Sequence, residues 1–222
     1  MEEKTATLQK AITFRAMRLG ARKIGFADLS AVGHPLTDRY PYGIALVLPM
    51  DEAIVGGCDE PSFFRHQVWQ RDELEAVKAS LGAILKEHGY KVHSVSNDMD
   101  PERFVGELSH KMVANLAGLG WIGKSSLFVT PEYGPRIRLT SLLTNARFLT
   151  WATPSASKCG DCDLCVTACS AGAIRNVEWK PGRSRDELLD VGLCVAYRTA
   201  MSRDKSRRYS CARCLNACPA GK

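Results

Sequence analysis

Residues 159–169 read Cys-Gly-Asp-Cys-Asp-Leu-Cys-Val-Thr-Ala-Cys, which places four cysteines at the spacing C-x2-C-x2-C-x3-C. With this spacing, short bacterial cysteine runs place three thiolates around one [4Fe-4S] cube and direct the fourth thiolate at a second cube. Loops of two residues suit a cube because consecutive thiolates need only reach adjacent corners. The stretch therefore predicts an iron–sulfur segment in the last third of the sequence.

A second set of cysteines follows along the chain. Cys194 is separated by sixteen residues from the run Cys211-Ala-Arg-Cys214-Leu-Asn-Ala-Cys218-Pro219. Eight thiolates complete two clusters, and the crossover known from two-cluster ferredoxins predicts how they are shared. The first expected ligand set is Cys159, Cys162, Cys165 and Cys218, and the second is Cys169, Cys194, Cys211 and Cys214.

Zinc is the alternative metal for a chain so rich in cysteine. Tetrahedral zinc sites usually show two separated C-x2-C pairs for each metal, which a triple C-x2-C-x2-C run fits poorly. The ninth cysteine, Cys58, stands apart from the other eight, and we assign it no role beyond packing or a spare thiol. Because nine is odd and disulfides are rare in the cytosol, metal binding is favoured over a disulfide framework.

Composition places the chain among ordinary globular proteins. Its 222 residues are 45% hydrophobic and 24% charged, which fits one domain or a large domain with a small appendage. No stretch approaches the roughly 18 apolar residues of a membrane span, and the first residues lack a secretory apolar region, so we expect a cytoplasmic protein. Eight thiolates and two oxidised cluster cores would lower the formal charge from +6 to about +2. The basic excess is therefore a weak argument for nucleic acid.

Cysteine usage divides the chain into two regions. We expect an α/β (α+β) domain at residues 1–150 and a small ferredoxin-like domain with two [4Fe-4S] clusters at residues 151–222. The first region shows helical apolar spacing at residues 8–19 and 62–88, and strand patterns at residues 23–28, 43–48 and 90–95. A further helix is expected to start at Ser109, and the turn at residues 131–134 predicts a hairpin between residues 126–130 and 136–140. The turn-forming residues 151–157 form a plausible linker.

A glycine motif follows the helix that Ser109 starts. Gly118-Leu-Gly120-Trp-Ile-Gly123 matches the dinucleotide-binding pattern G-x-G-x-x-G. The preceding segment is helical rather than strand-like, however, and no acidic residue stands about twenty positions further on. We therefore expect these glycines to let the backbone turn sharply, or pass close to a flat ligand, rather than to bind a dinucleotide.

The run Ala117-Gly-Leu-Gly-Trp-Ile-Gly-Lys124, the following run Ser126-Leu-Phe-Val-Thr-Pro-Glu-Tyr-Gly134 and the eight cysteines together resemble epoxyqueuosine reductase and its relatives. That family shares its core with the corrinoid-dependent reductive dehalogenases. The resemblance extends from about Tyr42 to Cys218. It implies an α/β corrinoid-binding domain and a two-cluster domain, in which electrons enter through the clusters and reduce cobalamin to its nucleophilic Co(I) state.

The resemblance also implies residues that bind the corrinoid. A flat indole and a lysine beside glycine-opened backbone suit an amide-rich macrocycle, and His66 lies in an aromatic-His pair that the family places near the cofactor. An ordinary core role for the tryptophan and a surface role for the histidine remain open alternatives. The candidate cofactor-binding residues are Gly118, Gly120, Trp121, Gly123, Lys124, Ser125 and His66.

Several positions depart from the family pattern. Phe104 stands where the queuosine enzymes have an acidic proton donor, which leaves the catalytic residue unknown and His110 as a weak candidate. Ser125 replaces the family asparagine, and Ser170 follows a cysteine where proline is usual. The sequence given stops four residues after Cys218 without the helical-repeat region that holds tRNA in long members, so we do not expect tRNA binding.

The electron donor and the substrate class are open. The basic run at residues 203–208 is a candidate surface for an acidic, low-potential donor such as ferredoxin or flavodoxin, and a solvated charged loop is the alternative. We predict a cobalamin- and iron–sulfur-dependent oxidoreductase acting on an unidentified substrate. The rival hypothesis is an electron carrier or reductive activator with a docking domain and no substrate chemistry of its own.

Overall fold

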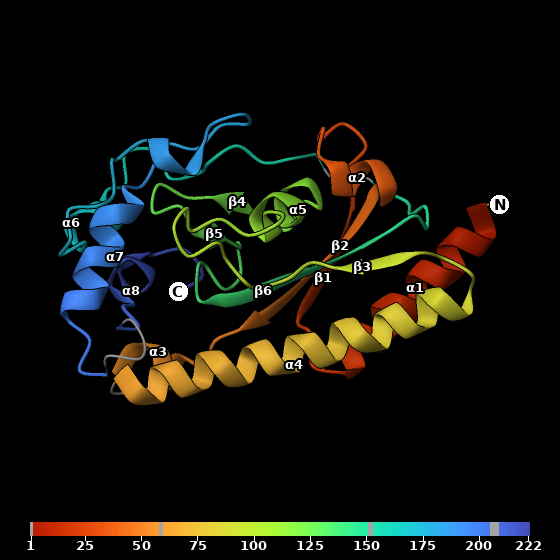
Figure 1. Cartoon of the computed structure of the whole chain (residues 1–222), viewed down its shortest axis with the longest axis horizontal. Coiled ribbons are helices and arrows are strands. Elements are labelled where there is room, and N and C mark those ends of the chain that lie inside the picture. Colours follow the sequence, from red (N-terminus) through yellow and green to blue (C-terminus); the bar gives the residue numbers. More distant parts are fainter. Residues whose placement is uncertain (1, 58–59, 151–152, 205–208) are drawn as a thin grey trace. The chain divides into compact units, whose positions relative to one another are not determined.

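The computed structural model describes residues 2–57, 60–150, 153–204 and 209–222, so Cys58 lies outside the described residues (Figure 1). The chain divides into two compact units. The sheet unit comprises Met1–Pro49, Trp69–Leu119 and Arg138–Ser155. The cysteine unit comprises Met50–Val68, Gly120–Ile137 and Ala156–Lys222, so it includes two segments from the first 150 residues.

The sheet unit is built on a mixed α/β framework (Figure 1). Its four-stranded sheet has the order β1-β2-β6-β3, with β1 antiparallel to β2 and β3 antiparallel to β6. The strands are β1 (Lys23–Asp28), β2 (Tyr42–Pro49), β3 (Val92–Ser94) and β6 (Ile137–Thr144). The helices are α1 (Glu2–Arg18), α2 (Pro35–Arg39), α4 (Glu60–Glu87), which begins in the cysteine unit, and α5 (His110–Leu116).

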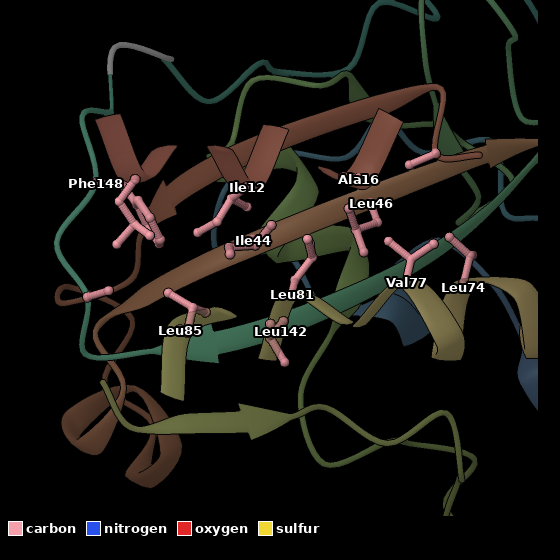
Figure 2. Packing of buried hydrophobic residues seen from close by; sticks show 13 residues of the cluster. Ile12, Ala16, Ile44, Leu46, Leu74, Val77, Leu81, Leu85, Leu142 and Phe148 are labelled. Carbon is pink, nitrogen blue, oxygen red and sulfur yellow. The ribbon is translucent and has the colours of Figure 1, made fainter. Parts of the chain in front are cut away.

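One face of the sheet carries the main hydrophobic core. Side chains from α1, β2, α4 and β6 gather there in one layer (Figure 2). Alternate residues of a strand point to opposite faces, so Ile44 and Leu46 of β2 meet the apolar stripe of α4 formed by Leu74, Val77, Leu81 and Leu85. Burial of this stripe holds the second half of α4 on the sheet.

The opposite face of the sheet is lined by small residues because α5 packs closely on it. A Cβ atom on Gly43 would lie 2.7 Å from Val113 Cγ1 of α5. A Cβ atom on Gly25 would lie 2.8 Å from the Cβ of Ala117 just after that helix. These glycines therefore set the distance between β1, β2 and α5, and hence the position at which the chain leaves α5 towards the glycine motif.

The structure confirms most of the predicted elements and corrects one. The strands at residues 23–28 and 43–48 and the long helix at residues 62–88 correspond to β1, β2 and α4, and Ser109 Oγ accepts a hydrogen bond from Met112 N at the start of α5. The predicted hairpin partner is wrong, because β5 (Phe128–Val129) pairs with β4 (Trp121–Ile122). The turn at residues 131–134 is closed by the Thr130–Gly134 bridge, while β6 joins the large sheet.

The cysteine unit consists of short elements joined by turns. Its helices are α3 (Glu52–Gly57), α6 (Leu164–Thr167), α7 (Val191–Ala200) and α8 (Arg213–Ala217), with one 3-10 turn at Arg185–Glu187. Met50, Val55, Phe63 and Leu215 form a small core that holds α8. Across the described residues, none of the helices combines the length and the apolar character needed to cross a bilayer.

We expect Gly25→Ala to destabilise the protein by about 1–3 kcal/mol, because the added methyl group meets Ala117 Cβ, which cannot rotate away. Gly82→Ala in α4 is the matched control. Its added Cβ would lie an ordinary 3.6 Å from Val92, and alanine is more favourable than glycine within a helix by about 0.5–1 kcal/mol, so this variant should be as stable as the unsubstituted protein or more so. Urea unfolding of both variants tests this. Equal stability of the two variants would contradict the close packing of α5.

Candidate functional site

The eight cysteines of the cysteine unit are all free and partly exposed. Cys165 lies in α6, Cys194 in α7 and Cys214 in α8, while the others occupy the turns beside these helices. The chain at α8 is tied to α3 and to the start of α4: Asn216 Nδ2 of α8 donates to the Val55 carbonyl of α3, and Ser210 N, just before α8, donates to Oε1 of Glu60 at the start of α4. Val55 and Glu60 therefore help to hold the segment that carries Cys211, Cys214 and Cys218.

The first group of thiols can be recognised from their mutual electrostatic effects. Burial raises the pKa of the Cys165 thiol, and the neighbouring thiols of Cys159, Cys218 and Cys162 raise it further. The pKa of Cys218 is raised by burial as well, and Cys159 and Cys162 are again its cysteine neighbours. These four cysteines are the same residues as the first predicted ligand set.

The second group surrounds Cys214. Burial raises the pKa of the Cys214 thiol to about 12, and Cys211, Cys169 and Cys194 are the neighbours with the largest further effect. The pKa of Cys194 is also raised by burial, with Cys169 and Cys211 beside it and Arg198 acting in the opposite direction. Cys169, although it ends the first cysteine run, thus lies with the cysteines of the later segment.

These raised pKa values have a chemical consequence. Metals and clusters bind thiolates, so ligation at these sites must displace the thiol protons, and the positive charge of the metal must stabilise the resulting thiolates. Among the described residues, no three His, Cys, Asp or Glu side chains form the kind of group that could hold a metal ion. The thiols of Cys165 and Cys214 nevertheless each have thiols of both cysteine runs as electrostatic neighbours.

The glycine motif lies in a tight hairpin beside the first thiol group. Gly118 has a φ of +70° after α5, as expected of a sharp turn. A Cβ atom on Gly120 would lie 2.0 Å from the Val129 carbonyl oxygen, so glycine is required for the β4–β5 pairing itself. A Cβ atom on Gly123 would lie 3.5 Å from Cys159 Sγ, which places the hairpin turn directly against a cysteine of the first group.

Three of the predicted cofactor residues are buried together on this hairpin. Trp121, Lys124 and Ser125 are each less than a tenth exposed. The Trp121 indole Nε1 has no hydrogen-bond partner among the described residues, and the Lys158 ammonium lies 5.6 Å from the centroid of its ring. A buried donor without an acceptor is costly, so this edge of the hairpin suits a ligand that carries hydrogen-bond acceptors.

His66 has a local role in the structure. Its Nε2 accepts a hydrogen bond from Asp51 N at 3.2 Å, just before α3. This contact fixes the start of a short helix in the cysteine unit, which is a structural function independent of any cofactor.

His110 has a strongly perturbed pKa. Burial lowers its pKa to about 4, and the nearby Lys78 ammonium lowers it further, whereas a backbone contact at Ser96 and the Glu107 carboxylate act in the opposite direction. Both ring nitrogens are buried and make no hydrogen bond that meets ordinary distance criteria. His110 is therefore neutral at pH 7.

The acidic residues of the preceding loop are occupied by the loop itself. Asp100 Oδ1 accepts hydrogen bonds from Glu102 N and Arg103 N, which hold the pKa of this carboxyl below its usual value. Phe104 has a positive φ of 53° at the position where an acid was expected from the resemblance. The structure therefore supplies no acidic proton donor at that position.

Comparison with known proteins supports the resemblance deduced from the motifs. Residues 158–221 match the family described as "4Fe-4S double cluster binding domain". Epoxyqueuosine reductase from Listeria monocytogenes is 34% identical over 124 residues, which cover 51% of this chain and 30% of that protein. The Bacillus anthracis enzyme is 33% identical over 161 residues, covering 68% and 37%. The chain thus spans about a third of the curated relatives it matches.

Solved structures show the same fold. Epoxyqueuosine reductase from Bacillus subtilis matches with a TM-score of 0.66 and 22% identity, covering 98% of this chain and 66% of that one. A catabolic reductive dehalogenase matches with a TM-score of 0.77 and 19% identity, covering 96% and 32%. The predicted resemblance to epoxyqueuosine reductase is confirmed, as is the mixed α/β fold with a double [4Fe-4S] domain towards its C-terminus.

The lowered pKa of His110 makes stability depend on pH. The unfolded chain takes up a proton on this histidine below about pH 6.5, whereas the folded protein does so only near pH 4. Stability is therefore lost as the pH falls through this window, by on the order of 2 kcal/mol between pH 7 and pH 5. His110→Phe removes this loss, which urea unfolding at several pH values measures. Parallel pH profiles for the two proteins would contradict the burial of a neutral imidazole.

Proposed function

We propose that this chain is an iron–sulfur reductase resembling epoxyqueuosine reductase, which passes electrons through two [4Fe-4S] clusters to a corrinoid and then to a substrate. The observation that carries this proposal is the contact between the glycine hairpin and the first thiol group, since Gly123 lies against Cys159. A ligand bound at the hairpin would be within electron-transfer reach of a cluster held by that group. The cytoplasm, where thiols stay reduced, suits such a protein.

The two groups of thiols are the proposed cluster ligands. The first cluster would be held by Cys159, Cys162, Cys165 and Cys218, and the second by Cys169, Cys194, Cys211 and Cys214. The electrostatic neighbours of Cys165 and Cys214 support this division, as does the double-cluster family match over residues 158–221. Because the segments intertwine, electrons can pass between the clusters over a short distance.

The corrinoid is proposed from the hairpin and its similarity to corrinoid enzymes. A structurally similar reductive dehalogenase is described in connection with B12-dependent dehalogenation. In this chain the buried Trp121 N–H without a partner, and the buried Lys124, suit the amide groups of a corrin. A bound corrinoid supplies a low-potential cobalt centre. The residues proposed to hold it are Gly118, Gly120, Trp121, Gly123, Lys124 and Ser125, with His66 a weaker candidate because its Nε2 is engaged by Asp51 N.

His110 is the catalytic candidate in the sheet unit. Since its pKa is about 4, it can donate a neutral N–H hydrogen bond at pH 7 but does not store a transferable proton. We therefore propose no role for it in proton transfer. A reductase of this kind would take the proton from another group or from solvent.

The proposed partner is an acidic, low-potential electron donor such as ferredoxin or flavodoxin. Of the basic run at residues 203–208, Arg203 is exposed and residues 205–208 lie outside the described residues. The helix α7, which carries Cys194, exposes Leu193, and Met201 follows it at the surface. Exposed apolar and basic side chains close in sequence to a proposed cluster ligand suit an acidic redox partner. A relative was solved with an epoxyqueuosine-modified tRNA stem loop, but we propose no tRNA binding for this chain.

A second candidate function is an electron-transfer or activator protein without its own substrate. Phe104, in place of the expected acid, favours this alternative. It shares the clusters with the first proposal and differs from it in binding no corrinoid. Cobalamin binding therefore separates the two functions.

Paired cysteine substitutions test the proposed ligand sets. Cys169→Ser with Cys214→Ser removes two ligands of one cluster, so about four of eight iron atoms should remain. Cys165→Ser with Cys214→Ser removes one ligand from each cluster and should lose nearly all iron. Iron and acid-labile sulfide analysis measures both. If the first pair lost all iron, Cys169 and Cys214 would belong to different clusters and the crossover would be wrong.

Anaerobic titration with cobalamin tests the proposed cofactor. We expect the cluster-containing protein to bind one equivalent at micromolar concentration, and Trp121→Ala with Lys124→Ala to weaken binding at least tenfold. Equilibrium dialysis with the visible spectrum of cobalamin gives the affinity, and the exposed Trp69→Ala is the control. No binding by a protein with both clusters intact would contradict the reductase and leave the electron carrier.

A further inference from the structure

Arg136 is a buried cation in the cysteine unit, at the end of the turn that precedes β6. Its residue is 6% exposed, and no carboxylate of the described chain pairs with it. Burying an arginine is expensive unless its donors are satisfied and its charge is compensated. The partners of this guanidinium therefore need an explanation.

The hydrogen bonds of Arg136 converge on one short segment. Nη1 donates to the Cys218 carbonyl at 3.1 Å, and Nη2 donates to the Ala220 carbonyl at 2.5 Å. The guanidinium thus brackets Pro219 and holds the backbone on both sides of it. Cys218 itself lies just after α8 in an extended conformation, so the helix does not fix it.

The turn that carries Arg136 is interlocked with the same segment. A Cβ atom on Gly134 would lie 2.0 Å from the Ala220 carbonyl oxygen, and one on Gly221 would lie 2.2 Å from Gly134 N. The two backbones meet where neither residue can carry a side chain. Thr130 and Gly134 close the turn with paired backbone hydrogen bonds, so a rigid support faces Cys218 and the residues after it.

The two carbonyl groups accept hydrogen bonds from Nη1 and Nη2 of Arg136 but carry no negative charge that would balance the guanidinium. A [4Fe-4S] cluster with four thiolates carries a net charge of about −2 when oxidised and about −3 when reduced. Cys218 is a proposed ligand of the first cluster, and the guanidinium of Arg136 lies 3.1 Å from its carbonyl oxygen. A cluster at this group would be the anion that the buried guanidinium otherwise lacks.

We propose that Arg136 is a positioning residue for the first cluster, which clamps the fourth ligand Cys218 and stabilises the reduced cluster by its charge. This inference rests on the proposed ligand sets. Reduction adds one electron to the cluster and no proton, so a nearby fixed cation favours the reduced form and raises the potential. The first cluster, if Cys159 beside Gly123 is one of its ligands, would then be tuned from the side of Cys218.

Redox titration followed by electron paramagnetic resonance tests the proposal. Arg136→Gln should lower the potential of one cluster and leave the other unchanged. The expected change is at least tenfold in the ratio of reduced to oxidised cluster at a fixed potential, which is about 59 mV for a one-electron couple. Arg136→Lys keeps the charge and should shift the potential less. Arg175→Gln is the control, because Arg175 is exposed and pairs with Asp190 at 3.3 Å.

The outcomes separate this inference from the proposed function. Loss of about four iron atoms from Arg136→Gln would support the clamp on Cys218. If Arg136→Lys loses the same iron, the clamp depends on the two-pronged hydrogen bond, which lysine cannot make, rather than on charge. Two clusters with unchanged potentials in Arg136→Gln would overturn the inference alone. Absence of clusters from the unsubstituted protein would overturn the proposed function and the inference with it.

Discussion

The close approach of thiols from the two cysteine runs is the constraint on which the proposed cluster sites depend. Cys218 lies with the thiols of the first run, while Cys169 lies with those of the later segment. Neither run can therefore adopt its final position without the other, and α6 packs against α8. The supports around this exchange all act on the later segment: the core around Leu215, the Asn216–Val55 hydrogen bond and the guanidinium of Arg136.

Elements determined by local pattern could be predicted from the sequence. β1 and β2 follow from short apolar runs, and α4 from an apolar stripe ended by Gly89. The hairpin was mispredicted because a turn signal gives the place of a reversal but not the partner of each strand. The turn at residues 131–134 is real, yet β5 pairs backwards with β4 since Gly120 allows close approach to Val129.

Some residues of the candidate site could also be predicted from the sequence, and others could not. The cysteines could be found because their spacing is itself the geometric requirement of a cube. Arg136 could not be predicted as a functional residue, because its hydrogen-bond partners lie 82 and 84 residues away and no motif around it indicates contact with Cys218. The proton donor is the opposite case. The resemblance gives it a position, and at that position the structure has Phe104 in a loop held by Asp100.

The proposed route for electrons runs from a donor through two clusters to a corrinoid at the hairpin. The central claim is that electrons reach the hairpin only through the thiol groups. The most direct measurement is the visible spectrum of protein-bound cobalamin during stepwise anaerobic reduction, compared between the unsubstituted protein and the variant that lacks Cys169 and Cys214. The account predicts stoichiometric Co(I) at a rate that falls at least tenfold in the variant. Equal rates in the two proteins would contradict it.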